Sequence, residues 1–191
     1  MTEQTTQKKY ELLKDDTVEH FGRTLYRIKA LITFGLVGAG ELGGYIETEK
    51  NLDHSGNAWV YDNALVYGNA EVYGDARVYG DARVYGDAWV FGNAWVYGDA
   101  RVYGDAWVYG DARVRSFAVI SERKMIFGAS NVGSENGRLT VFNGKFGLIV
   151  TRGCFTGTVD EFLSKSKEVH DDKTHHEYKL LIEVAQSRIL N

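Results

Sequence analysis

A valine recurs at every sixth residue through the middle of this 191-residue chain. It stands at each sixth position from Val60 to Val114, Ile120 takes the next position, and an alanine precedes each of them by two residues. Glycine follows the valine by two residues from Gly68 to Gly110, so the repeated phrase is A-x-V-Y-G-D, with N for D in some copies. A strict period decides the architecture before any other property, because every copy must adopt the same local structure.

The six-residue phrase predicts a coil of parallel β-strands. Alanine and valine alternate with the variable position and tyrosine, so the first two point to one side and the last two to the other. Glycine followed by asparagine or aspartate is a turn pair. Three phrases can close a triangle in which valine stacks on valine of the next turn, and only alanine fits beside it. The eleven phrases of residues 55–120 then make between three and four turns, each rising about 4.8 Å.

This pattern resembles the signature of the hexapeptide-repeat, left-handed parallel β-helix family, which is an aliphatic residue, two or three variable positions and a small residue. The match runs from Val60–Ala64 through every later copy, and the tyrosine that usually follows valine departs from the family, which often has glycine there. The resemblance implies left-handed winding and, commonly, a trimer. The segments LYRIKAL, ELGGYIE and NLDHSGNAWV resemble the lead-in of such proteins from bacteria, phages and prophages, which implies a phage or prophage source.

The start and the end of the period divide the chain into three regions. Residues 1–50 are predicted to form an N-terminal β cap, with two strands around a bend at Phe21–Gly22. Residues 51–120 hold the repeat, and residues 121–191 are predicted to form a small α+β unit. The fold class is therefore mainly β, with a coil between two caps that cover its open strand edges.

The C-terminal region combines strands with two helices. Its strands fall within about 124–152, with Asn143–Gly144 as a hairpin turn. Its helices are predicted at about 158–169 and about 174–190, each with an apolar stripe. Two capping-box pairs mark their starts, Thr158 with Glu161 and Thr174 with Glu177.

Variable positions eighteen residues apart fall on the same face of such a coil, which gives three outer faces. The first face carries Trp59, Arg77, Trp95 and Arg113, which alternate as cation–π pairs can. The second face carries Arg83 and Arg101 beside Tyr85 and Tyr103. The third face carries contiguous aromatic residues and almost no charge: Tyr73, Trp89, Phe91, Trp107 and Tyr109.

Two interpretations of these faces compete. Stacked tyrosines and tryptophans stiffen a sheet, and aromatic residues with arginine also mark subunit interfaces. We favour an interface on the third face, which predicts a homo-oligomer and, from the resemblance, a trimer. The arginines of the second face can meet a phosphate or a carboxylate, although solvated charge offset by the aspartate column is the simpler explanation.

Composition limits the partners and the compartment. The formal net charge is −4 and no segment is strongly basic, which argues against nucleic acid. No apolar stretch is long enough to span a bilayer, and no signal peptide is recognised at the start. The single Cys154 fits a reducing compartment. We therefore expect a cytoplasmic protein with no membrane partner and no cofactor.

Candidate catalytic and metal-binding residues are few. Hexapeptide-repeat acyltransferases use a histidine at a cleft between coils, yet residues 55–120 contain no histidine and only His54 lies near. Cys154 and His170 are sixteen residues apart with a helix between them, so we expect no contact and a buried, structural cysteine. The segment from His170 to His176 is predicted to be a solvated, capping linker rather than a metal site.

The sequence therefore predicts a non-enzymatic, self-associating binding scaffold without catalytic or metal-binding residues. Its outer faces would bind a subunit, a host protein or a small phosphate-bearing ligand, with counter-defence inhibition or sequestration as the expected role of a phage protein. The alternative is a hexapeptide-repeat acyltransferase with a degenerate site.

Overall fold

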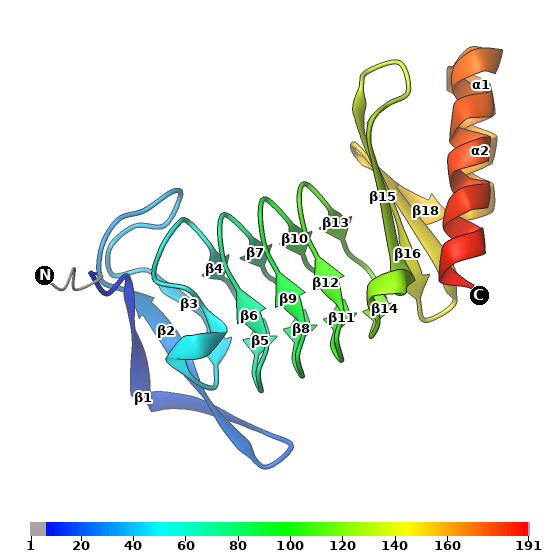
Figure 1. Ribbon diagram of the computed structural model, residues 1–191. Coiled ribbons are helices and arrows are strands. Elements are labelled where there is room, and N and C mark those ends of the chain that lie inside the picture. Colours follow the sequence, from blue (N-terminus) through cyan, green and yellow to red (C-terminus); the bar gives the residue numbers. More distant parts are fainter. Residues whose placement is uncertain (1–6, 191) are drawn as a thin grey trace, which may run out of the picture.

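A coil of very short strands forms the middle of the molecule (Figure 1). The computed structural model describes residues 7–190. Each strand of the coil holds two residues, the variable residue and the aliphatic residue of one phrase. The strands are β4 (Trp59–Val60), β5 (Leu65–Val66), β6 (Glu71–Val72), β7 (Arg77–Val78), β8 (Arg83–Val84), β9 (Trp89–Val90), β10 (Trp95–Val96), β11 (Arg101–Val102), β12 (Trp107–Val108), β13 (Arg113–Val114) and β14 (Val119–Ile120).

These strands form three sheets, one for each side of the coil. The orders are β4–β7–β10–β13, β6–β9–β12 and β5–β8–β11–β14. Every pairing is parallel and joins residues eighteen apart, as Trp89 pairs with Trp107 and Val90 with Val108. The prediction of a mainly β chain with a repetitive coil and two C-terminal helices is therefore confirmed.

Valine and alanine fill the interior of the coil. The aliphatic residues from Val60 to Ile120 are fully buried, and so are the alanines that precede them. Glycine is favoured at the bends from Gly68 to Gly110 because consecutive turns of the coil approach closely there. Gly92, for example, has φ +69°, and a Cβ at that position would lie 3.0 Å from the backbone nitrogen of Gly110. Both the angle and the space at Gly92 disfavour a larger residue. Asp62 and Ser116 adopt a positive φ at the first bend and at a late bend of the coil.

The N-terminal region extends one side of the coil and covers part of two sides. β1 (Tyr10–His20) and β2 (Arg23–Ala30) form an antiparallel hairpin, and β3 (Leu42–Ile46) joins β2 to β5. The predicted bend at Phe21–Gly22 is confirmed, with positive φ at both residues.

Buried polar groups close the N-terminal mouth of the coil. The short helix η1 (Glu49–Asn51) places the fully buried Asn51 at this end. Its Nδ2 donates to the carbonyl oxygens of Gly68 at 3.0 Å and Ala70 at 2.9 Å, which satisfies two acceptors at the mouth of the coil. The Nζ of Lys9 donates to the carbonyl oxygen of Ala58 at 2.9 Å in the same way.

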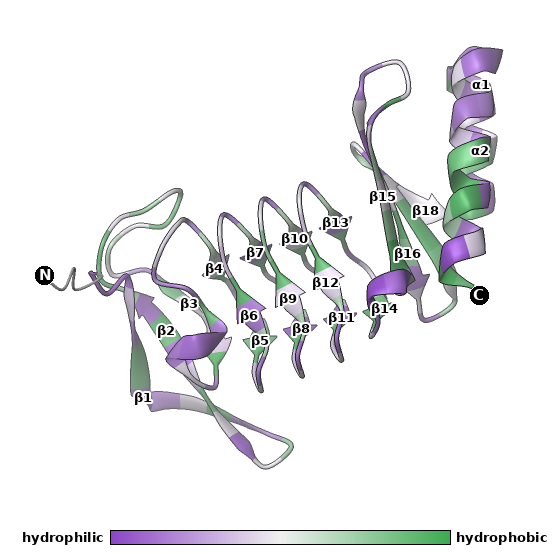
Figure 2. Ribbon diagram, viewed as in Figure 1, coloured by the Kyte–Doolittle hydropathy of each residue, from purple (hydrophilic) through white to green (hydrophobic). Residues whose placement is uncertain are grey.

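The C-terminal region is an antiparallel sheet with two helices packed on it. Hydrophobic residues gather on the second helix and on the neighbouring strands (Figure 2). One of its side chains, Phe142, belongs to the interior cluster of the coil, so this sheet closes the far end. The elements are η2 (Arg123–Met125), β15 (Ile126–Val132), β16 (Gly137–Gly144), β17 (Gly147–Arg152), β18 (Phe155–Thr158), α1 (Val159–Val169) and α2 (Asp172–Ile189).

Two details of this region differ from the prediction. The hairpin turn consists of Lys145 and Phe146, because Gly144 still pairs with Gly147. Asn143 lies in the strand, and its Nδ2 donates to the carbonyl oxygen of Val119 at 3.0 Å, which fastens the sheet to the coil. The predicted turn at Asn143–Gly144 is therefore wrong by two residues.

Of the two predicted helix starts, one is confirmed and the other is wrong. The capping box of α1 is confirmed, with Thr158 and Glu161 bonded to each other's backbone. The predicted start of α2 at Thr174 is wrong, because Asp171 is the N-cap and accepts from the backbone nitrogen of Thr174 at 2.7 Å. Within residues 7–190 no helix is both long enough and apolar enough to cross a bilayer.

Candidate functional site

The sheet β6–β9–β12 carries two columns of stacked aromatic rings, which we call the aromatic face. In one column Trp89 and Trp107 lie 5.2 Å apart with ring planes 5° from parallel. In the other, Phe91 stacks on Tyr73 at 4.9 Å and on Tyr109 at 5.4 Å. Edge contacts join the columns, such as Phe91 with Trp107 at 6.3 Å. The five predicted aromatic residues thus form one continuous layer.

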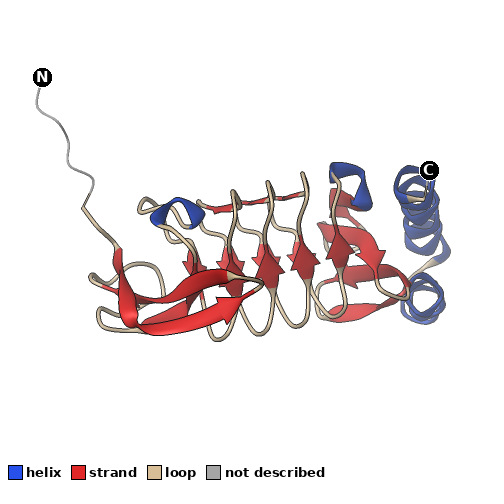
Figure 3. Ribbon diagram, turned by 90° about the horizontal axis from the view of Figure 1, so that it is seen from below, coloured by secondary structure: helices blue, strands red, loops and turns tan. Residues whose placement is uncertain are grey.

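The repeat produces this layer directly. Parallel strands in an eighteen-residue register place equivalent side chains one above the other, at nearly the spacing at which rings stack. Tyr109 at the end of its column is 50 % exposed, and the other four rings are partly buried by their neighbours. Along residues 7–190 no other strand or helix lies across the middle of the sheet, while η1 and η2 flank its two ends (Figure 3).

The two ends of the aromatic face differ in charge. At the N-terminal end a hollow of about 400 Å³ beside Tyr73 and Trp89 is lined by the carboxylates of Glu49, Asp53 and Glu71. At the C-terminal end the guanidinium carbon of Arg123 lies 3.8 Å from the ring centre of Trp107, a cation–π contact that ends the tryptophan column. Lys50 also lines the hollow and Lys8 pairs with Glu49, so the N-terminal end keeps an excess of carboxylates, while Arg123 at the C-terminal end pairs with Asp105 at 3.8 Å.

The second face is a ladder of tyrosines and arginines, partly covered by the N-terminal hairpin. Tyr85 stacks on Tyr103 at 4.9 Å, and Arg83 pairs in register with Arg101. Burial raises the pKa of Tyr85, and the neighbouring Tyr103 adds to the effect. Leu25 of the hairpin packs in one cluster with the first residues of this face, so only its later part is open.

The first face holds the predicted alternation of arginine and tryptophan around Trp95, where two guanidinium groups contact one ring. The guanidinium carbons of Arg77 and Arg113 lie 5.2 Å and 4.6 Å from the ring of Trp95. The prediction that Trp59 is displayed on this face is wrong, because Trp59 is fully buried. Tyr10 and Phe34 contact its ring edge-on at 6.1 Å and 5.3 Å.

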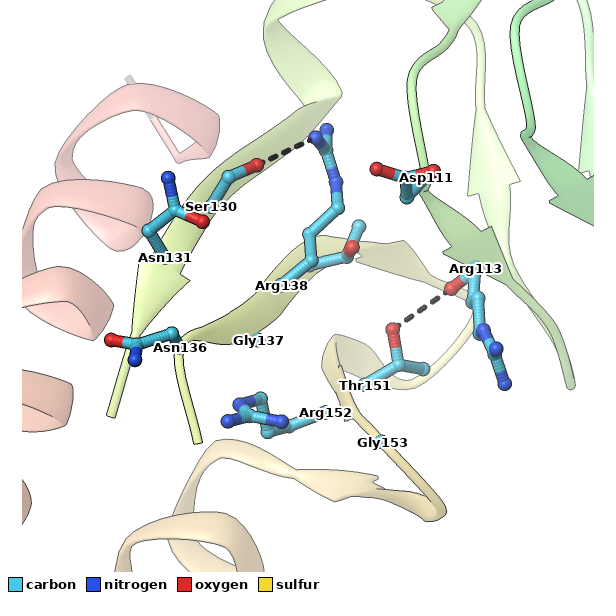
Figure 4. Close-up of a pocket in the computed structure, with 11 residues that line it drawn as sticks. Asp111, Arg113, Ser130, Asn131, Asn136, Gly137, Arg138, Thr151, Arg152 and Gly153 are labelled. Carbon is cyan, nitrogen blue, oxygen red and sulfur yellow. Dashed lines mark hydrogen bonds between the residues drawn. The ribbon is translucent and has the colours of Figure 1, made fainter. Parts of the chain in front are cut away.

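A pocket that the sequence analysis missed lies between the last turn of the coil and the C-terminal sheet (Figure 4). It has a volume of about 440 Å³, and its lining includes Arg113 from the coil with Arg138 and Arg152 from β16 and β17. These arginines come from distant segments of the sequence, and the docking of the sheet on the coil places them around one pocket, where their side chains point in different directions (Figure 4). No pattern in the sequence signals their proximity.

The remaining candidates take structural positions. His54 stacks on Tyr10 with ring centres 4.3 Å apart, and its Nδ1 accepts from the backbone nitrogen of Lys9 at 3.1 Å. Burial lowers the pKa of His54. A side chain held by stacking and a backbone bond supports the packing of the N-terminal cap on the coil.

Cys154 is exposed, so the prediction of a buried cysteine is wrong. It also lines the same hollow of about 320 Å³ as His170, because β18 and α1 fold back on each other. His175 and His176 lie in the first turns of α2 rather than in a linker, which corrects that prediction. Within the described part of the chain, no three histidine, cysteine or acidic side chains gather as a metal site would require.

The comparison with protein families agrees with the coil. A family model described as the YdcK β-solenoid repeat matches residues 70–86, 76–92, 82–98 and 94–110. The chain carries a β-solenoid repeat. The matched segments lie within the coil and include Trp89 and Trp107 of the aromatic face. No curated protein matches the chain.

Proposed function

We propose that this β-solenoid is a non-enzymatic scaffold that associates with further copies of itself through the aromatic face. The observation that carries the proposal is the continuous layer of five stacked rings on β6–β9–β12, which the caps leave open. Such a layer has the composition of an interface core, which is rich in aromatic residues and poor in charge. Large contiguous apolar surface is unusual on a soluble monomer.

The charges at the two ends of the aromatic face bear on how copies pair. Glu71 at the N-terminal end forms no ion pair within residues 7–190. Arg123 at the C-terminal end is exposed, and its Nε lies 3.8 Å from Oδ2 of the equally exposed Asp105. A two-fold axis through the middle of the face would place Glu71 of each copy near Arg123 of the other. Three copies around an axis along the coil, as the family resemblance implies, would place like ends side by side. The charges thus favour a pair and the resemblance favours a trimer.

The test is the mass in solution of the double variant Trp89→Ala/Trp107→Ala. Because large aromatic side chains at the centre of an interface dominate its binding energy, we expect light scattering to give the subunit mass of 21.4 kDa for the variant. We expect two or three times that mass for the unchanged protein, and the factor decides between the pair and the trimer. Circular dichroism checks that the coil remains folded.

Trp95→Ala is the matched control, because Trp95 occupies the same position of the repeat on the first face. The control should keep the mass of the unchanged protein. A double variant that keeps its full mass, a control that loses it, or an unchanged protein that is a monomer would each refute self-association through the aromatic face.

Further parts of the proposal rest on the family resemblance. We infer a left-handed coil, a phage or prophage source and a place in the bacterial cytoplasm, where the scaffold would inhibit or sequester a host component. The alternative, an acyltransferase with a degenerate site, is disfavoured because His54 is engaged with Tyr10 and Lys9. Saturable binding of acetyl-CoA in calorimetry would favour the enzyme.

A further inference from the structure

The pocket between the coil and the C-terminal sheet concentrates positive charge in a polar cavity. Its lining contains Arg113, Arg138, Arg152 and one acid, Asp111. The guanidinium of Arg113 lies over the ring of Trp95 at 4.6 Å, so Arg138 and Arg152 supply the positive charge, and with Asp111 the formal charges sum to +1 (two minus one). Its other lining residues are glycine, serine, threonine and asparagine. None of the five rings of the aromatic face lines this pocket, so a ligand here would not depend on self-association through that face.

Arg138 is the best positioned of the three arginines. Its guanidinium lies against the backbones of Gly110 and Gly128, where a Cβ would come within 3.1 Å of Nη1 and 2.5 Å of Nη2 respectively. Nη1 donates to Oγ of Ser130 at 3.1 Å, the contact drawn in Figure 4. Its Nε is buried and has no hydrogen-bond partner among residues 7–190. A buried donor without an acceptor is costly, so an acceptor supplied by a ligand would stabilise it.

Arg152 also retains a free donor. Its Nε donates to the hydroxyl of Tyr178 at 3.1 Å and its Nη2 donates to the carbonyl oxygen of Val132 at 3.3 Å, whereas Nη1 makes no hydrogen bond within the described chain. Neither Arg138 nor Arg152 has a carboxylate within 4.0 Å among the described residues. The two side chains are therefore held by neutral groups while their charge is left unneutralised.

We propose that this pocket binds a small phosphorylated molecule rich in hydroxyl groups, such as a sugar phosphate. Arginine presents a planar fork of donors that matches the oxygens of a phosphate. Asp111, Asn131 and Asn136 line the same cavity and can bond to hydroxyl groups. None of the lining residues of this cavity is aromatic, so a nucleobase would find no ring on which to stack.

The experiment is isothermal titration of the full chain with glucose 6-phosphate, glucose, inorganic phosphate and adenosine monophosphate. We expect saturable binding of glucose 6-phosphate, weaker binding of inorganic phosphate and none of glucose. Arg138→Gln should weaken the binding about tenfold or more, because it removes a charge-assisted contact to phosphate. Arg188→Gln is the control, since Arg188 is exposed in the last turn of α2 and does not line the pocket, and it should leave the affinity unchanged.

Four other outcomes would overturn the proposal. Glucose bound as well as its phosphate, inorganic phosphate bound as tightly as the sugar phosphate, or adenosine monophosphate bound more tightly would overturn the ligand class. No saturable binding of any phosphate at millimolar concentration would overturn the site. The ligand series on the unchanged protein decides the matter even where Arg138→Gln lowers the unfolding temperature.

Discussion

Lys9 closes the N-terminal mouth of the coil with a buried amine, and its titration should be visible in the stability of the protein. The residue is 1 % exposed, and its Nζ lies 2.9 Å from the carbonyl oxygen of Ala58 and 4.8 Å from the ring centre of Phe34. Burial lowers the pKa of Lys9 from 10.5 to about 8, although the carboxylates of Asp53 and Asp75 act in the opposite direction.

The sign of the pH dependence follows from which state holds the proton. Between about pH 8 and pH 10.5 the unfolded chain keeps the Lys9 proton while the folded chain releases it. Because the unfolded state then binds more protons, the free energy of unfolding rises with pH through this window. Below about pH 8 both states are protonated, and the folded state carries the cost of a buried charge.

The magnitude follows from the same pKa. A shift of this size corresponds to at most about 3 kcal/mol. Ser55 and Gly56, whose carbonyl oxygens lie beside Nζ, are exposed, so water lies close to the amine. Screening by that water reduces the expected effect to about 1–2 kcal/mol.

Lys9→Met is the variant that isolates the effect, because methionine keeps an unbranched chain without the amine. Denaturant unfolding of both proteins at pH 7 and at pH 10 gives four free energies of unfolding. We expect the difference between the unchanged protein and Lys9→Met to grow by about 1–2 kcal/mol in favour of the unchanged protein at pH 10. The tyrosines are common to both proteins, so their titration cancels in this difference.

The same measurements can refute the reasoning. An equal change of stability with pH in the two proteins would mean that Lys9 does not carry a lowered pKa. A difference that shrinks toward pH 10 would mean that the folded state binds the Lys9 proton more tightly, and the sign would be wrong.

Two further predictions concern the glycine bends and the cysteine. Gly92→Ala should lower the free energy of unfolding by about 1–3 kcal/mol more than Gly22→Ala. Both glycines have positive φ, but only a Cβ at Gly92 meets the next turn of the coil. Equal losses of stability in urea unfolding would contradict the close approach at Gly92. Cys154 is exposed, so one thiol per chain should react with a disulfide reagent under native conditions. A reaction that requires denaturant would show that Cys154 is protected.

Much of the coil could be read from its residues because the information is local. Each phrase carries its own strand and bend, and the eighteen-residue register follows from three phrases per turn. The stacking of Trp89 on Trp107 was therefore predictable from their separation alone. The start of α1 was also predictable, since Thr158 and Glu161 bond within one turn, whereas the N-cap of α2 proved to be Asp171 rather than Thr174.

What the sequence alone could not decide depends on contacts between segments far apart in the chain. Trp59 matches the displayed residues of the repeat, yet Tyr10 and Phe34 return from the N-terminal region to bury it. The chain determined by itself which side chains repeat and in what order they stack, because short-range geometry sets the period. Only the tertiary structure decided which faces stay open and which arginines line one pocket, because the docking of the caps on the coil depends on long-range packing that no repeat encodes.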